Sequence, residues 1–390
     1  MQSYLVLSGG YDTKNVGDYA MLRFFTEKAH EASYRVTLLS RHLHTFLQRY
    51  YGVDEIVKNF EYDSKAESKG NFFKGLNFGE PTDQLHRITR LLSESSGLVI
   101  GGGRLLVDFT LGTMRGPLAY WGTLVTLCKF LGVPVHIYAM TFIPLKTETG
   151  EQWVRYIVDN CETVTVRDQG SKDYLLQIGC RHTGIRVAPD PAFAMPWTQS
   201  PMNNGRIAVS ARHISPAYAG MDAERYIDQM VWLCREISER GYRPVGIAHC
   251  YYGTDDPLAD DRTTLKKIAE RSPLEVVEGE MLDLEAYRRF YNSVDALIGI
   301  RRHAMLFAAV AGVPVLGICE NENGIRGCQD IGAMDPLRLD FSPQQARDKL
   351  DELLSHKDDI AARQRLHIEQ RRAELEKVYV TAPYFQPRPA

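Results

Sequence analysis

Apolar and polar positions along the chain alternate between short buried strands and helices. The clearest unit lies between residues 294 and 318, where Val294–Ile300 and Val313–Ile318 are apolar runs that predict buried strands. Between them, Ala304–Ala311 is apolar on all sides and predicts a buried helix. Strands without polar alternation that are joined by a helix are typical of parallel sheets covered on both faces, so this unit predicts an α/β fold.

The same alternation extends over both halves of the chain. Predicted strands in the first half are Tyr4–Leu7, Arg35–Leu39, Gly97–Ile100, Pro134–Ala139 and Thr163–Val166, and predicted helices are Tyr19–Ala32, Thr82–Ser93, Ala119–Leu131, Glu151–Cys161 and Asp168–Ile178. The second half adds strands Ile207–Ala211, Pro244–Ala248 and Leu274–Val277, and helices Asp222–Arg240, Asp260–Glu270, Leu284–Ser293, Pro343–Ser355 and Lys357–Val378. Each half therefore predicts a doubly wound sheet of about six strands.

A chain of 390 residues exceeds what one hydrophobic core usually covers, so two domains are expected. We predict a Rossmann-like domain over residues 1–199 and a second one over residues 206–390, separated by a linker rich in Pro, Asn and Gly. The long charged C-terminal helix is expected to return to the first domain. The polar stretch Asp63–Pro81 predicts a flexible loop.

Composition narrows the function classes. A net charge of −3 gives no general reason to expect nucleic acid or an anionic membrane as a partner, so any basic site must be local. Seven scattered cysteines without a C-x-x-C pair indicate reduced core thiols rather than disulfides or a zinc cluster. With no signal-peptide pattern at the start and no helix long enough to span a bilayer, we expect a cytoplasmic protein with at most peripheral membrane contact.

Candidate chemistry gathers where predicted strands end. Arg301, Arg302 and His303 follow a buried strand and precede a helix, whose amino terminus favours an anion. Burying these charges without an anionic partner is costly, so we favour a phosphate or carboxylate site over structural ion pairs. Gly101–Gly103 follow another strand. They either let backbone amides come close to a ligand or form a tight turn. Asp168 is interpreted as a helix cap.

Two doubly wound sheets predict a cleft between the carboxyl ends of their strands. The residues expected to line it are Asn15, Gly17, Asp18, Gly101, Gly102, Gly103, Arg104, Arg212, His249, Arg301, Arg302 and His303. Such a site has one carboxylate, several guanidinium groups and imidazole. It suits a small substrate that carries several negative charges and needs proton transfer.

A series of short motifs in this order resembles the polysaccharide pyruvyl transferase family. The motifs are Asn15-Val16-Gly17-Asp18-Tyr19-Ala20, Gly101-Gly102-Gly103 with Asp108, Arg167-Asp168 with Ser171, Asp190-Pro191-Ala192-Phe193, Ser210-Ala211-Arg212 and Arg301-Arg302-His303-Ala304 leading to Gly312-Val313-Pro314. The resemblance spans residues 15 to 318. It implies two lobes of the GT-B kind with C-terminal helices, the first lobe on the acceptor side and the second binding the donor.

The resemblance also implies a reaction. A pyruvyl group would pass from phosphoenolpyruvate to a pair of sugar hydroxyls in exopolysaccharide or capsule biosynthesis, forming a ketal and releasing phosphate, with no cofactor beyond the donor substrate. Arg212, Arg301 and His303 correspond to donor-binding positions, and we expect Arg302 between them to contact the donor as well. His303 is expected to act as the acid or to bind the anion, and Asp18 to act as the base or to orient the acceptor hydroxyls. Asn15, Gly17, Gly102, Gly103, Arg104 and His249 are expected to contact the acceptor or shape the loops.

Some positions depart from the family pattern, and they leave two alternatives open. Arg302 stands where the family usually has an apolar residue, Tyr19 where an acidic residue is usual, and Arg104 where a small or polar one is commoner. We expect these changes to add positive charge and an aromatic surface to the cleft. The alternatives are a GT-B glycosyltransferase that uses a nucleotide sugar, with Asp255 or Glu320 on the ribose, and a non-catalytic anion-binding protein of the same pathway. The sugar and its carrier, lipid, nucleotide or free glycan, stay undetermined.

Overall fold

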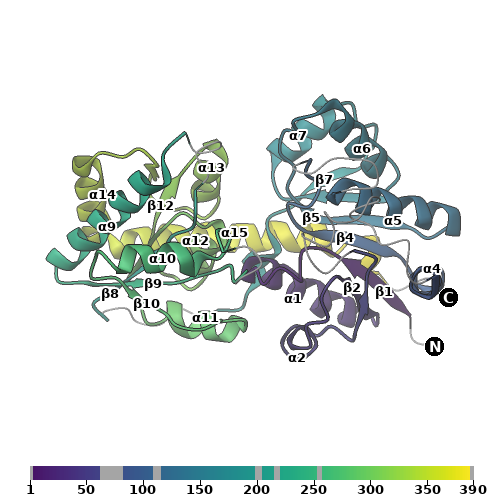
Figure 1. Ribbon diagram of the computed structural model, residues 1–390, viewed down its shortest axis with the longest axis horizontal. Coiled ribbons are helices and arrows are strands. Elements are labelled where there is room, and N and C mark those ends of the chain that lie inside the picture. Colours follow the sequence, from purple (N-terminus) through teal and green to yellow (C-terminus); the bar gives the residue numbers. More distant parts are fainter. Residues whose placement is uncertain are drawn as a thin grey trace. The chain divides into compact units, whose positions relative to one another are not determined.

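The computed structural model describes residues 3–61, 82–108, 116–197, 204–214, 220–252 and 257–386. The chain divides into two compact units (Figure 1). The first unit comprises residues 1–12, 18–191 and 374–390, and the second comprises residues 13–17 and 192–373. The predicted loop at 63–81 and most of the predicted linker at 200–205 lie outside the described residues.

The first unit is built on a seven-stranded sheet with the order β3-β2-β1-β4-β5-β6-β7, in which neighbouring strands run parallel. Its elements are β1 (Tyr4–Ser8), α1 (Val16–Glu31), β2 (Arg35–Ser40), α2 (Phe46–Tyr51), β3 (Glu55–Lys58), α4 (Thr82–Glu94), β4 (Leu98–Gly103), α5 (Pro117–Leu131), β5 (Val135–Met140), α6 (Glu148–Asp159), β6 (Thr163–Val166), α7 (Gln169–Gln177) and β7 (Ile185–Val187). The α/β prediction is confirmed for this half.

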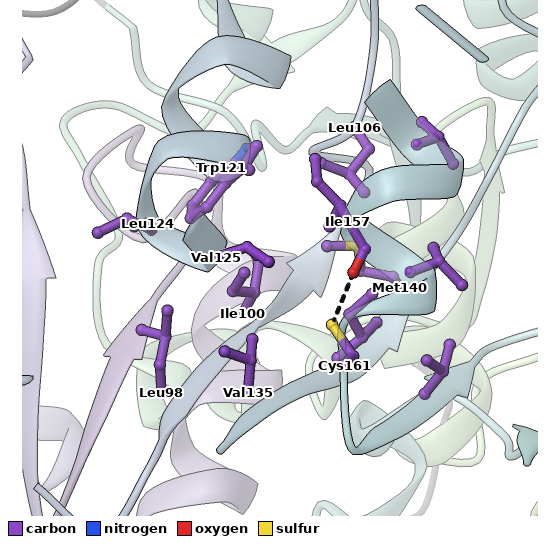
Figure 2. Close-up of a cluster of buried hydrophobic side chains, with 14 of the residues drawn as sticks. Leu98, Ile100, Leu106, Trp121, Leu124, Val125, Val135, Met140, Ile157 and Cys161 are labelled. Atoms are coloured by element: carbon purple, nitrogen blue, oxygen red, sulfur yellow. Dashed lines mark hydrogen bonds between the residues drawn. The ribbon is translucent and has the colours of Figure 1, made fainter. Parts of the chain in front are cut away.

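One face of the first sheet is covered by a single apolar cluster. Ile100 on β4 and Val135 on β5 point toward Trp121 and Val125 on α5, as Figure 2 shows. The thiol of Cys161 donates to the carbonyl oxygen of Ile157 at 3.2 Å, which satisfies a buried sulfur at the end of α6. Because the strands are buried on both faces, they lack the polar alternation of a half-exposed sheet.

The opposite face of the first sheet is covered by α1 and by the C-terminal segment. Tyr138 on β5 donates its hydroxyl to the carbonyl of Met21 and packs edge-on against Phe25 on α1. Tyr384 and Phe385 of the 3-10 turn Pro383–Phe385 pack against the same aromatic group. The end of the chain thus completes the core of the first unit.

The second unit contains a six-stranded sheet with the order β10-β9-β8-β11-β12-β13, whose neighbouring strands are also parallel. Its elements are β8 (Arg206–Ser210), α9 (Ala223–Glu239), β9 (Arg243–Gly246), α10 (Asp261–Ala269), β10 (Glu275–Val276), α11 (Leu284–Tyr291), β11 (Ala296–Gly299), α12 (Arg302–Val310), β12 (Val315–Cys319), α13 (Glu322–Asp330), β13 (Leu337–Arg338), α14 (Pro343–Ser355) and α15 (Lys357–Tyr379). A 3-10 turn, Pro191–Ala194, precedes β8 in the chain. The part of α15 from Glu374 onward belongs to the first unit. Among the described helices, none combines the length and the apolar character needed to cross a membrane.

Three predicted boundaries differ from the structure near candidate residues. α1 begins at Val16 rather than at residue 19, because Asn15 and Val16 are held by backbone contacts that start the helix early. β4 continues through Gly103, since glycine tolerates the positive φ of +87° found there. α12 begins at Arg302 rather than at residue 304, so its first turn is charged.

A buried ion pair closes the first unit beside β6. Arg167 donates to Asp190 at 2.7 Å and to the hydroxyl of Thr141 at 2.8 Å, and the Asp190 side chain is fully buried. Next to it, Asp168 accepts from the amide of Ser171 at 2.7 Å, which confirms the predicted cap of α7.

We predict that Asp190→Ala destabilises the protein by about 3–5 kcal/mol, because it leaves the Arg167 charge buried without its partner. The double variant Arg167→Met, Asp190→Leu is expected to recover most of the loss. Glu94→Gln, at the exposed pair with Arg90, is the control and should change the free energy of unfolding by less than about 1 kcal/mol. Urea denaturation measures all three, and a cost for Asp190→Ala no larger than that of the control would contradict the prediction.

Candidate functional site

The carboxyl ends of β8, β11 and β12 lie side by side at one edge of the second sheet. β8 pairs with β11 so that Ser210 is opposite Gly299, and β11 pairs with β12. Arg212 follows β8 and Arg301 follows β11, so residues far apart in sequence emerge from neighbouring strands. Ligands of parallel α/β sheets bind at this edge.

Arg301 is oriented by a buried carboxylate, that of Asp261. Its Nε lies 3.0 Å from Oδ1 and 3.1 Å from Oδ2 of Asp261, and Nη2 donates to Oδ1 as well. Burial works against the charge of the guanidinium, but the Asp261 carboxylate outweighs it and raises the pKa of Arg301 above its usual value. Arg301 is also the N-cap of α12, and its side chain makes no capping hydrogen bond.

Asp261 does more than pair with arginine. It is the first residue of α10, and its Oδ2 accepts the backbone amides of His249 at 3.0 Å and Cys250 at 3.1 Å. Its side chain is completely buried. One carboxylate therefore joins the loop after β9, the start of α10 and the residue that opens α12.

The other two arginines also have carboxylate partners. Arg212 donates to Glu320 at 2.6 Å, and because β11 lies between β8 and β12, this bridge passes over the carboxyl end of β11. Arg302 lies 3.5 Å from Asp330, which also accepts Arg371 at 3.2 Å. Asp261, Glu320 and Asp330 are therefore carboxylate partners of these arginines, which sequence spacing did not reveal.

His303 lies in the first turn of α12 against the backbone of Gly17. A Cβ added to Gly17 would come within 1.9 Å of Nδ1 of His303, so only glycine leaves room for the imidazole. Asn15 forms a β-bridge with Cys250, and the amide of Val16 donates to the carbonyl of His249 at 3.0 Å. The segment 13–17 is thus part of the second unit, and its residue Gly17 packs against the imidazole of His303.

His249 is buried beneath this edge. Its Nε2 lies 3.0 Å from the hydroxyl of Tyr291, and only 1% of the residue is exposed. Burial, with the charges of Arg301 and His303, holds the pKa of His249 well below its usual value. The imidazole therefore stays neutral, while the backbone amide of the same residue donates to Asp261.

Candidate residues of the first unit form a separate group around Asp18. A Cβ on Gly103 would lie 3.0 Å from Oδ1 of Asp18, and one on Gly102 would lie 2.7 Å from the hydroxyl of Tyr11. Burial raises the pKa of Tyr11 well above its usual value, and the charge of Asp18 adds to this effect. The glycines thus allow close packing inside the protein, while Arg104 is exposed at the end of β4.

Tyr19 is completely buried against Phe46 and Tyr51, so the expectation of an aromatic surface at this position is wrong. Asp261 was missed, because Asp260 and Asp261 before a helical pattern read as ordinary capping residues, and Asp260 is indeed the cap of α10.

Among the described residues, no group of three or more His, Cys, Asp or Glu is arranged to hold a metal ion.

Solved structures with the same fold cover nearly the whole chain. HepE from Anabaena, in complex with UDP and glucose, is 11% identical with a TM-score of 0.63 and covers 98% of this chain and 99% of that chain. A putative UDP-N-acetylglucosamine 2-epimerase from Listeria monocytogenes is 12% identical with a TM-score of 0.58 and covers 100% of both chains. UDP-GlcNAc 2-epimerase from Neisseria meningitidis, bound to UDP-GlcNAc, is 10% identical with a TM-score of 0.57 and covers 97% and 98%. These similarities show a fold of the GT-B kind.

Sequence comparison identifies the family. A search of curated protein sequences found no match. The family model for polysaccharide pyruvyl transferases matches residues 15–319, a range that includes both groups of candidate residues and most of the chain. This protein therefore belongs to the polysaccharide pyruvyl transferase family.

Proposed function

We propose that this protein transfers a pyruvyl group from phosphoenolpyruvate to two hydroxyls of a sugar, releasing phosphate and forming a cyclic ketal. The observation that carries the proposal is the pair of guanidinium groups, Arg212 and Arg301, at the carboxyl edge of β8 and β11. Each is held by its own carboxylate, and the start of α12 with His303 lies beside Arg301. The family supports transfer to a polysaccharide precursor, and the donor is part of the proposal.

Phosphoenolpyruvate carries a carboxylate and a phosphate, and arginine forks match both groups. Asp261 contacts Nε and Nη2 of Arg301, so the Nη1 edge is the one that meets a ligand. The ion pairs therefore orient the arginines, because a guanidinium has more donors than one carboxylate uses. The N–H groups at the start of α12 add to the attraction for an anion.

The reaction needs a proton at the methylene carbon of the donor and removal of protons from two acceptor hydroxyls. In our proposal His303 is the acid or an anion ligand, and Asp18 is the base or orients the acceptor hydroxyls. After protonation, the first sugar hydroxyl adds to the adjacent carbon, and the second displaces phosphate from it. Arg302 adds positive charge beside His303, and no redox step is required.

Two other functions are tested by the same ligands. A glycosyltransferase would bind a nucleotide sugar, and of the two carboxylates considered for its ribose, Glu320 is already paired with Arg212 while Asp255 lies outside the described residues. HepE, which shares the fold, was solved with UDP and glucose, so UDP-glucose is the suitable competitor ligand. A non-catalytic protein would bind an anion without turnover.

We predict that phosphoenolpyruvate stabilises the protein against thermal unfolding, by about 2.7 kcal/mol at a hundredfold excess over its dissociation constant. UDP-glucose should have no comparable effect. Phosphate release on adding sugar acceptors then separates an enzyme from a binding protein. Stabilisation by UDP-glucose but not by phosphoenolpyruvate would overturn the proposal in favour of a glycosyltransferase.

We also predict that Gly17→Ala lowers phosphate release by about a hundredfold, because the new methyl group displaces the imidazole of His303. The double variant Gly17→Ala, His303→Ala should be no slower than His303→Ala alone, since both changes remove the same interaction. Gly327→Ala, within α13 and with open space at its Cβ, is the matched control. Wild-type rates for Gly17→Ala, or additive losses in the double variant, would remove His303 from the mechanism.

A further inference from the structure

Three sulfur atoms lie close together at the carboxyl end of β12 in the second sheet. The Sγ atoms of Cys319 and Cys328 are 3.7 Å apart, and Sγ of Cys328 lies 3.7 Å from Sδ of Met305 on α12. Cys319 is the last residue of β12, and Cys328 lies on α13. Both residues are buried, with 2% and 1% of their surfaces exposed. A disulfide has a sulfur separation of about 2.0 Å, so a small approach joins this pair.

The helix that carries Cys328 is held by few buried side chains. Of the nine residues of α13, only Gly327 and Cys328 are buried, and Asn321 caps its exposed start. Gly324 packs directly on Cys319, and an added Cβ would lie 3.1 Å from the Cβ of that cysteine. An element with so little buried apolar surface opens at a lower cost than the strands beneath it. Such local opening would admit an oxidant as small as hydrogen peroxide.

The two thiols have opposite tendencies to ionise. The hydrogen-bond contact with Cys328, opposed by burial and helped by the charge of Arg338, lowers the pKa of Cys319. The same contact, together with burial, raises the pKa of Cys328 well above its usual value. Because the thiolate is the nucleophile, Cys319 attacks first and Cys328 resolves.

We propose that Cys319 and Cys328 are an oxidation site at which a hydroperoxide closes an intrachain disulfide and disturbs the ion pair of Glu320 with Arg212. The Cys319 thiolate attacks one oxygen of hydrogen peroxide, giving a sulfenic acid and, after protonation of the leaving hydroxide, water. The Cys328 sulfur then displaces the sulfenic hydroxyl, which leaves as a second water with the thiol proton. Overall, two thiols and one hydrogen peroxide give one disulfide and two waters.

The effect on the donor side follows from the neighbours of the pair. Glu320 follows Cys319 directly and accepts Arg212 at 2.6 Å. Sγ of Cys328 lies against β12, since a Cβ on Gly317 would be 2.3 Å from it. Closing the 3.7 Å gap between the sulfurs requires a shift of the side chains, of the end of β12 or of α13, and a shift at the end of β12 moves Glu320, the next residue. The effect on phosphoenolpyruvate rests on the proposed function, whereas the chemistry of the disulfide does not.

The chemistry is tested by peroxide treatment and peptide mass spectrometry without reduction. Trypsin cuts after Arg326, so Cys319 lies in peptide His303–Arg326 and Cys328 in peptide Gly327–Arg338. The expected product is this pair of peptides joined with the loss of two hydrogens and separated again by dithiothreitol. Cys319→Ser and Cys328→Ser should each abolish the product. Cys234→Ser, which changes another buried thiol of the second unit, should not.

The coupling is tested by titrating phosphoenolpyruvate into reduced and oxidised protein. We expect the dissociation constant to be about tenfold larger after oxidation and to return to its original value with dithiothreitol. Peroxide-treated Cys328→Ser should not show this increase. Recovery of only sulfinic or unmodified Cys319, with no joined peptides, overturns the oxidation site. A joined pair with unchanged donor affinity overturns the coupling. If reduced protein does not bind phosphoenolpyruvate, the proposed function fails, and a dithiothreitol-reversible shift in melting temperature that Cys328→Ser lacks still supports the disulfide and its effect on β12.

Discussion

The contact between Asp261 and Arg301 is the interaction on which the carboxyl edge of the second sheet depends. A carboxylate that is fully buried is stable as an anion only if hydrogen bonds and an opposite charge surround it. Here two backbone amides and one guanidinium provide them. In return, the guanidinium is held in one orientation at the start of α12. The same contact thus stabilises the unit and prepares the site.

Parallel topology explains why so few residues suffice to build this edge. In the order β9-β8-β11-β12, the residues after four strands come together although the chain visits them far apart. Arg212 and Arg301 follow neighbouring strands and Arg212 reaches Glu320 for this reason, and Gly17, from the other end of the sequence, packs against His303. Each arginine is paired with a carboxylate, which lets several guanidinium groups lie at one edge without a bound anion. An anion then competes for donors that are already oriented.

The sequence predicted the features that depend on local pattern. Apolar runs located β11 and β12, and the position of Arg301 and His303 at a helix start followed from them. Features that depend on long-range contacts were not predictable. The short edge strands β3, β7 and β13 carry too few apolar residues for periodicity, Tyr19 is buried by residues of α2 that no local pattern indicated, and the role of Asp261 arises from a partner forty residues away. The glycines of β4 show the same limit, since their close contacts are with Tyr11 and Asp18.

In our proposal, Asp261 orients Arg301 to bind a doubly anionic donor. Calorimetric titration of phosphoenolpyruvate into wild type and Asp261→Asn isolates this contact, because the variant keeps the shape of the side chain and removes its charge. Asp228→Asn, which breaks an exposed pair with Arg271, is the control. We expect the dissociation constant of Asp261→Asn to be larger by about tenfold or more, because one charged hydrogen bond is lost, and that of the control to be unchanged. Equal affinity of wild type and Asp261→Asn, with both folded, would contradict it.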